Sequence, residues 1–149
     1  MSSVRFLNAF SVDDVLIDEL AKLPFNSGGT RRICMHSSEL SPLHVMVVES
    51  TDGSNFPRHH HADSDELSIL IRGKLEVLAW ENGAEAKATR RVLGPSDGEC
   101  RAVLLPKNTP HTTKPLGGNC IYLEVKLGPF DRDALCYTDK KDRKGPSVF

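Results

Sequence analysis

The stretch HHHADSDELSILIRG, His59–Gly73, carries the pattern that decides the fold. In an extended strand the side chains of residues i and i+2 share a face, so His59 and His61 point one way and His60 points the other. The four residues that follow suit a tight polar turn, which brings a second strand back with Glu66 aimed at the same point. The sequence therefore predicts two imidazoles and one carboxylate that converge at the start of paired strands.

A third imidazole is expected from a distant strand, at His111. Imidazole nitrogens with one carboxylate suit Fe(II), Mn(II), Ni(II), Cu(II) or Zn(II), whereas Ca(II) and Mg(II) prefer shells of oxygen atoms. The alternative is a solvated loop, because histidine clusters alone are weak signals. The apolar alternation through Leu67–Ile71 favours the metal site, since a carboxylate that enters a barrel needs a partner. The predicted ligands of one divalent transition-metal ion are His59, His61, Glu66 and His111.

The composition fits one soluble domain. A length of 149 residues is enough to bury a core but leaves no room for a second domain. The formal net charge of −1 argues against nucleic acid as the main partner. The amino terminus lacks the apolar run of a signal peptide, and no stretch is long enough to span a membrane. The four cysteines have no CxxC spacing, so we expect free thiols in a reduced, cytoplasmic protein.

After Gly29 the chain consists of short β-like runs separated by turn residues. The expected strands are Arg32–His36, Leu43–Glu49, Phe56–His61, Glu66–Arg72, Lys74–Glu81, Lys87–Leu93, Arg101–Leu105, His111–Thr113 and Asn119–Lys126. Asn82-Gly83 marks a hairpin, because both residues tolerate positive φ. This spacing indicates a sandwich or closed barrel over residues 31–130, and residues 131–149 form a tail or wrapping arm.

Residues 1–30 are expected to form a helical lead-in that packs outside the barrel or against a partner subunit. Ser11 and Asp14 resemble a capping box, and Pro24 or the Asn-Ser-Gly-Gly run after it ends the helix. The apolar stripe of this helix consists of Val12, Val15, Leu16, Leu20 and Leu23.

At these residues the sequence resembles the cupin superfamily. The first cupin motif is matched by Gly53, His59, His61, Glu66 and Gly73. The second motif, Pro106–His111, is looser: Asn108 replaces the usual glycine, and asparagine is the next-best residue for a left-handed turn. Pro115 stands where the family often has asparagine. The resemblance implies an all-β fold, the double-stranded β-helix or jelly-roll barrel, that binds metal through His59, His61, Glu66 and His111.

More closely, the chain resembles the WbuC-type cupin-fold metalloproteins, which are encoded among bacterial surface-polysaccharide genes. The likeness runs from the amino-terminal helix to about Asp131 and includes Arg31–His36, Val92–Pro95 and Leu123–Asp131. It implies a metal-binding barrel but no settled reaction. We expect a small-molecule substrate, with a nucleotide-sugar as one candidate. Single-domain cupins commonly dimerise, so we also expect a homodimer in which the helix or the tail covers edge strands.

Four protein ligands leave an octahedral ion two open positions. Such an ion can act as a Lewis acid that polarises a carbonyl or hydroxyl group during isomerisation or epimerisation of a sugar. An Fe(II) centre could instead support a dioxygenase reaction, because the open-site geometry serves both. A non-catalytic module that binds metal and a small molecule is the third hypothesis. Of the three, we expect the isomerase or epimerase reaction.

Tyr122 and Glu124 are the candidate catalytic residues, because they share one face of their strand. If that face is inside the barrel, Tyr122 can donate a proton and Glu124 can orient a ligand histidine. In the alternative, Glu124 forms a structural ion pair with an arginine.

Other histidines and arginines are expected to have structural or substrate-binding roles. His36 and His44 are expected to be structural, since a lone imidazole can be satisfied by hydrogen bonds. Arg31, Arg32 and Arg58 are candidates for holding the phosphate or carboxylate of a nucleotide-sugar, although exposed arginines are common.

Overall fold

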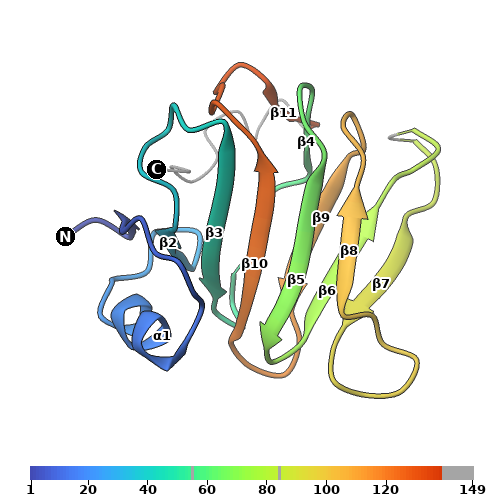
Figure 1. The fold of residues 1–149 in the computed structure, drawn as a ribbon. Coiled ribbons are helices and arrows are strands. Elements are labelled where there is room, and N and C mark those ends of the chain that lie inside the picture. Colours follow the sequence, from blue (N-terminus) through green and yellow to red (C-terminus); the bar gives the residue numbers. More distant parts are fainter. Residues whose placement is uncertain (55, 84, 139–149) are drawn as a thin grey trace.

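The computed structural model describes residues 1–54, 56–83 and 85–138, which form two β-sheets packed face to face and one short helix (Figure 1). The six-stranded sheet has the order β1-β2-β3-β10-β5-β8, and the five-stranded sheet has the order β11-β4-β9-β6-β7. The elements are β1 Val4–Phe6, α1 Asp14–Ala21, β2 Thr30–Cys34, β3 Leu43–Ser50, β4 His59–His61, β5 Glu66–Arg72, β6 Leu75–Ala79, β7 Thr89–Leu93, β8 Ala102–Leu105, β9 His111–Pro115, β10 Cys120–Leu127 and β11 Leu135–Tyr137. The predicted all-β, jelly-roll architecture is confirmed.

All the predicted strands are present, with ends that differ by three residues or fewer. Two further strands lie outside residues 31–130, the range assigned to the barrel. β1 pairs in parallel with β2, and β11 pairs with β4, where Leu135 is opposite His61. A three-residue strand is too short to show a readable alternation, so the sequence pattern does not predict either one. The segment expected to be a tail therefore places an edge strand beside the histidines.

The apolar core lies between the two sheets, because alternate residues of each strand point inward. Its best-buried members, each at most 1 % exposed, are Cys34, Met46, Val48, Leu75, Val77, Leu93 and Cys120. β10 lies inside the six-stranded sheet and is antiparallel to both β3 and β5. This arrangement fixes which face of β10 looks into the barrel.

Helix α1 packs on the outer face of the six-stranded sheet, near β2 (Figure 1). The residues in this contact are Leu16, Ile17, Leu20, Ile33, Val47 and Ile121. The predicted start at Ser11 is wrong: Asp13 is the N-cap, and its carboxylate accepts a hydrogen bond from the N–H of Leu16. The buried face also differs from the predicted stripe, because Val15 is 71 % exposed and Ile17 is buried. Among the described residues, no helix combines the length and apolar character that crossing a membrane requires.

Two tight turns position the strands that carry the site. Asn108 has a φ of +63°, the left-handed conformation predicted for it from the second motif. Gly73 follows β5 with a φ of +83°, and a Cβ added there would lie 2.7 Å from the carbonyl oxygen of Asn119. Only glycine suits that position. The hairpin at Asn82-Gly83 joins β6 to the antiparallel β7, as predicted.

Candidate metal centre

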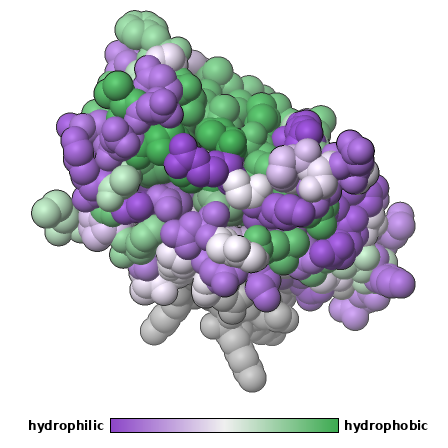
Figure 2. All heavy atoms as spheres, turned by 90° about the horizontal axis from the view of Figure 1, so that it is seen from below, coloured by the Kyte–Doolittle hydropathy of each residue, from purple (hydrophilic) through white to green (hydrophobic). Residues whose placement is uncertain are grey.

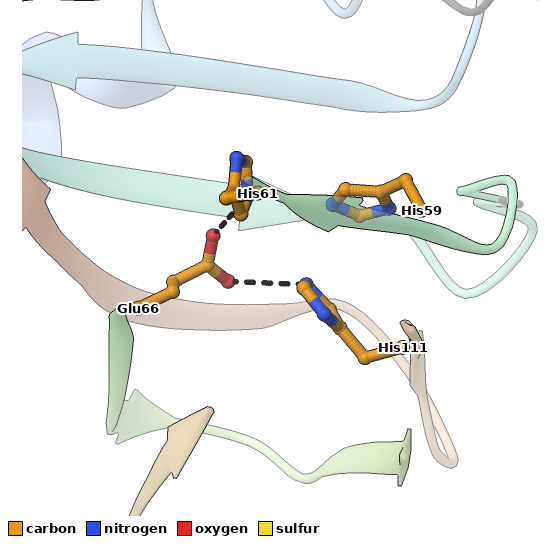
Figure 3. A group of neighbouring side chains, drawn as sticks. All are labelled: His59, His61, Glu66 and His111. Carbon is orange, nitrogen blue, oxygen red and sulfur yellow. Dashed lines mark ion pairs between the residues drawn. The ribbon is translucent and has the colours of Figure 1, made fainter. Parts of the chain in front are cut away.

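Four side chains from three strands converge between the sheets. His59 and His61 come from β4, Glu66 from the start of β5 and His111 from the start of β9. One ligand atom from each lies within 4.8 Å of the others. Figure 3 shows the Glu66 carboxylate between His61 and His111. Because β4 and β9 belong to one sheet and β5 to the other, the site joins the two sheets.

The four side chains line a pocket whose space, its open mouth included, is about 480 Å³. Each of the four residues is at most 7 % exposed. The other polar residues of the pocket lining are Thr30, Arg32, Thr113, Tyr122, Glu124 and Lys126. His60 is outside this lining, as strand alternation predicts.

Backbone carbonyls fix the orientation of two imidazole rings. Nδ1 of His59 lies 2.9 Å from the carbonyl oxygen of Pro57, and Nδ1 of His111 lies 2.9 Å from that of Thr109. A carbonyl oxygen only accepts, so each Nδ1 carries the proton and donates it. The neutral form of each ring then has its lone pair on Nε2. Outer hydrogen bonds of this kind commonly set the tautomer of histidines that bind metal ions.

The donor atoms fit a metal ion. Nε2 of His61 and Nε2 of His111 are buried and have no hydrogen-bond partner among the described residues. They lie 2.8 Å and 3.6 Å from the two carboxylate oxygens of Glu66, close in distance but without hydrogen-bond geometry. Buried polar atoms without a partner are rare in folded proteins. Imidazole nitrogens and a carboxylate around one point are a donor set that suits a divalent transition metal.

The electrostatics of the site are consistent with this donor set. Burial, reinforced by His111, lowers the pKa of His59 to about 3, so its ring is neutral. Burial alone would raise the pKa of Glu66, but its contacts with His111 and His61 outweigh burial and hold that pKa well below the usual value. Burial alone would lower the pKa of His111, but the Glu66 carboxylate raises it overall. The site thus keeps a buried anion beside a neutral imidazole.

Comparison with known proteins identifies the type of fold. No protein-family model matches the chain, and no curated protein matches it by sequence. Solved structures do match it. The protein SO0799 from Shewanella oneidensis has a TM-score of 0.67 at 16 % identity, covering 89 % of this chain and 87 % of that chain. KdgF from Halomonas sp. has a TM-score of 0.52 at 23 % identity, covering 70 % of this chain and 84 % of that chain.

A third match is CapF, a capsular polysaccharide assembling protein from Staphylococcus aureus. It has a TM-score of 0.60 at 15 % identity, covering 76 % of this chain and 30 % of that chain. These three neighbours are cupin-fold proteins. The chain has a cupin fold. At these identities the likeness establishes the fold and leaves the reaction open.

In the cupin barrel, Tyr122 and Glu124 face the same pocket as the metal-site residues. The hydroxyl of Tyr122 lies 3.4 Å from Oγ of Ser50, and burial, reinforced by the charge of Glu124, raises the pKa of Tyr122. The Glu124 carboxylate lies 3.3 Å from Nζ of Lys126, so its partner is a lysine and not an arginine. Lys126 was absent from the predicted site, although its i+2 spacing from Glu124 places it on the same face.

The other candidates are distributed around the cupin barrel. His36 and His44 stack with ring centroids 4.1 Å apart, outside the pocket lining, and Nε2 of His44 donates to the carbonyl of Glu39. This fits their expected structural role.

The three candidate arginines occupy different environments. Arg31 lies 2.6 Å from the Glu49 carboxylate, and the guanidinium of Arg58 lies over the ring of Trp80 at 4.6 Å. Of these arginines, Arg32 is the one that lines the pocket.

Proposed function

We propose that this cupin binds one divalent transition-metal ion through His59, His61, Glu66 and His111 and isomerises or epimerises a small molecule. The observation that carries the proposal is the convergence of these four donors on a pocket that also contains Tyr122 and Glu124. A metal ion held there would act as a Lewis acid that polarises a carbonyl or hydroxyl group of the substrate.

Tyr122 and Glu124 are proposed to move the protons. Burial raises the pKa of Tyr122, so its hydroxyl stays protonated and would give its proton only to a strongly basic atom, such as one in the enolate formed from the substrate. Glu124 offers a carboxylate in the same pocket, which can take a proton from the carbon next to the polarised carbonyl. One cycle would leave Glu124 protonated and Tyr122 deprotonated, and proton exchange with solvent through the pocket mouth would restore both.

A sugar or nucleotide-sugar of surface-polysaccharide metabolism is the proposed substrate. The expected resemblance to WbuC-type cupins motivates this class. The likeness in fold to CapF, a capsular polysaccharide assembling protein, supports it.

We also propose that the chain forms a homodimer through the outer face of the six-stranded sheet. An apolar row crosses four strands there, because Val45 is paired with Val125, Val125 with Leu67, and Leu67 with Leu104. Leu104 is 59 % exposed. In Figure 2, hydrophobic residues gather along the upper edge of the view, the side on which this sheet lies. A second copy related by a two-fold axis can present the same row.

The dimer is tested by light scattering after size exclusion. Leu67→Lys combined with Leu104→Lys should give a monomer, whereas Leu40→Lys, at an 81 % exposed position outside the row, should leave the dimer intact. A wild-type protein that is monomeric at high concentration contradicts this part of the proposal.

The reaction is tested on protein without a polyhistidine tag, reconstituted separately with Mn(II), Ni(II), Zn(II) and Fe(II). Sugars and nucleotide-sugars are incubated in D₂O, with and without O₂, and deuterium incorporation is followed by NMR. We expect incorporation that needs metal but not O₂. Tyr122→Phe and Glu124→Gln should lower kcat by about 100-fold or more while metal content stays unchanged.

Other outcomes separate the alternatives. Turnover that consumes O₂ and occurs with Fe(II) alone identifies a dioxygenase. Tight binding of a sugar without deuterium exchange or O₂ uptake identifies a binding module. Either result overturns the isomerase proposal while leaving the metal site in place.

A further inference from the structure

Arg32 is a buried cation without a counter-charge in the described part of the chain. It points into the barrel from β2 and is 4 % exposed. Its hydrogen-bond partner is Sδ of Met46 at 3.9 Å, a neutral and weak acceptor, and no carboxylate of the described residues pairs with it. Its neighbour Arg31, by contrast, lies 2.6 Å from the Glu49 carboxylate. Burying an unpaired charge is costly, so Arg32 has a reason to be there other than stability.

Thr30 lies beside Arg32 and is also a buried polar residue. The two residues are separated by one position on β2, so their side chains share the inward face. Thr30 is 3 % exposed, and its Oγ1 is buried without a hydrogen-bond partner among the described residues. Both residues line the pocket that contains the four metal-site residues. The pocket therefore holds a buried hydroxyl without a partner and a buried guanidinium whose side-chain partner is a thioether.

The charges of the pocket favour an anion. Arg32 and Lys126 contribute two positive charges and Glu66 and Glu124 contribute two negative charges, which sum to zero. The ammonium of Lys126 lies 3.3 Å from the Glu124 carboxylate, so those two charges offset each other. A divalent ion beside neutral imidazoles would then give the pocket a formal charge of +2. The Arg32 guanidinium offers a planar pair of donors, which matches the oxygens of a carboxylate or a phosphate.

We propose that Thr30 and Arg32 form an oxyanion subsite, so that the substrate of this pocket carries a carboxylate or phosphate group that binds Arg32. The inference rests on the proposed function, because it places this subsite and the metal ion in one pocket and lets one substrate reach both. It narrows the substrate class to anionic molecules, such as a sugar acid or a sugar phosphate. Neutral sugars are then poor ligands.

The test compares anionic and neutral probes on the Zn(II)-loaded protein. Glycolate and glycerol 3-phosphate represent the two oxyanions, and glycolamide is the neutral counterpart of glycolate. Affinities are measured by NMR titration for wild type, Arg32→Met, Arg32→Lys and Thr30→Val. Arg91→Met, at an exposed arginine of β7, is the control that changes the net charge equally. Zinc content is measured for every sample.

We expect at least one anion to bind wild type and Arg91→Met alike, and glycolamide to bind neither. Arg32→Met should weaken anion binding by about tenfold or more, since charge-assisted hydrogen bonds are lost. Arg32→Lys should keep part of the affinity, and Thr30→Val should weaken it by a smaller factor. Zinc content should be unchanged throughout. Without ligand, Arg32→Met should melt at a higher temperature than wild type, because it removes an uncompensated buried charge.

Three results overturn the subsite: neither anion binds the zinc-loaded wild type, glycolamide binds as well as glycolate, or Arg32→Met binds the anion as wild type does. If Arg32→Met does not fold, Arg32→Lys and Thr30→Val decide the question by the same comparison. A wild-type protein that takes up no zinc, yet binds an anion in an Arg32-dependent way, contradicts the proposed metal function and retains the subsite.

Discussion

His59 and His111 are paired directly across β4 and β9, with their ring centroids 4.4 Å apart. Directly opposed residues of antiparallel strands have side chains on the same face of the sheet. The pairing therefore delivers the third imidazole to the His59–His61 face, although His111 is far away in the chain. Glu66 then needs only to reach across from the other sheet to complete the cluster.

Strand alternation yields a sharp prediction for the three consecutive histidines. His59→Ala, His61→Ala and His111→Ala should each abolish most metal binding, whereas His60→Ala should not, because His60 lies outside the pocket lining. Metal content is measured by mass spectrometry after desalting. Equal metal loss in His60→Ala and His61→Ala would show that this segment does not bind metal as a strand.

Removal of the metal should destabilise the fold. An ion that binds only the native state adds its binding free energy, about 2.7 kcal/mol at a free concentration 100 times Kd. Thermal melts of the metal-loaded protein with and without chelator measure this difference. A melting temperature that chelator leaves unchanged, in protein that demonstrably held metal, contradicts the expectation.

Glu66→Gln separates the ligand role of the carboxylate from its effect on folding. Metal affinity should fall by more than the roughly 10–100-fold that outer-sphere partners are worth. The metal-free variant should be at least as stable as metal-free wild type, since a neutral amide avoids the desolvation of a buried anion. Titration calorimetry measures the metal affinity, and thermal melts of chelator-treated protein measure the stability of the metal-free variant. Full metal affinity in Glu66→Gln would exclude Glu66 as a ligand.

The turn after β5 should be sensitive to a single methyl group. Gly73→Ala should lower the free energy of unfolding by about 1–3 kcal/mol, because φ is +83° and the new Cβ would lie 2.7 Å from the Asn119 carbonyl oxygen. Gly53→Ala is the matched control, since a Cβ there would have nothing within 4 Å. Urea unfolding of both variants tests the claim, and equal stabilities would contradict it.

The cysteines should all be thiols. Cys34, Cys100, Cys120 and Cys136 are free in the structure. A thiol reagent should count four under denaturing, non-reducing conditions, and in the native protein Cys34 and Cys120 should be protected by burial. Fewer than four thiols after denaturation would indicate disulfides and contradict the expected reducing compartment.

The two buried thiols also predict an alkaline pH dependence of stability. Burial raises the pKa of Cys34 to about 11 and that of Cys120 to about 12, from an ordinary value of 9.0. The folded state therefore holds these protons more tightly than the unfolded state. Their contribution to stability is complete below pH 9.0 and is lost as the pH rises through about 11 to 12. Cys34→Ala combined with Cys120→Ala should flatten this decline in urea unfolding series.

Local patterns predicted much of this fold and little of its pocket chemistry. Period-2 alternation predicted that His60 lies outside the site that His59 and His61 share. The left-handed preference of asparagine predicted the turn at Asn108. The predicted start of α1 at Ser11 was wrong. Ser11 and Asp13 are both good capping residues, and tertiary packing decides which of them caps the helix.

What the sequence could not predict depends on contacts between distant strands. The pairing of β11 with β4 has no local signal in a three-residue strand. The partner of Glu124 proved to be Lys126 and not an arginine, and Arg32 has no carboxylate partner among the described residues. These contacts depend on which side chains of different strands the barrel brings together. Alternation along one strand does not predict them.

The most direct measurement of the central claim is metal stoichiometry in the tag-free protein. Calorimetric titration of Zn(II) or Mn(II) into metal-free wild type should give one tight site per chain. That site should disappear in His61→Ala and persist in His60→Ala. A wild-type protein that binds no divalent transition metal, or that binds it equally well after His61→Ala, would contradict the assignment of His59, His61, Glu66 and His111 as a metal centre.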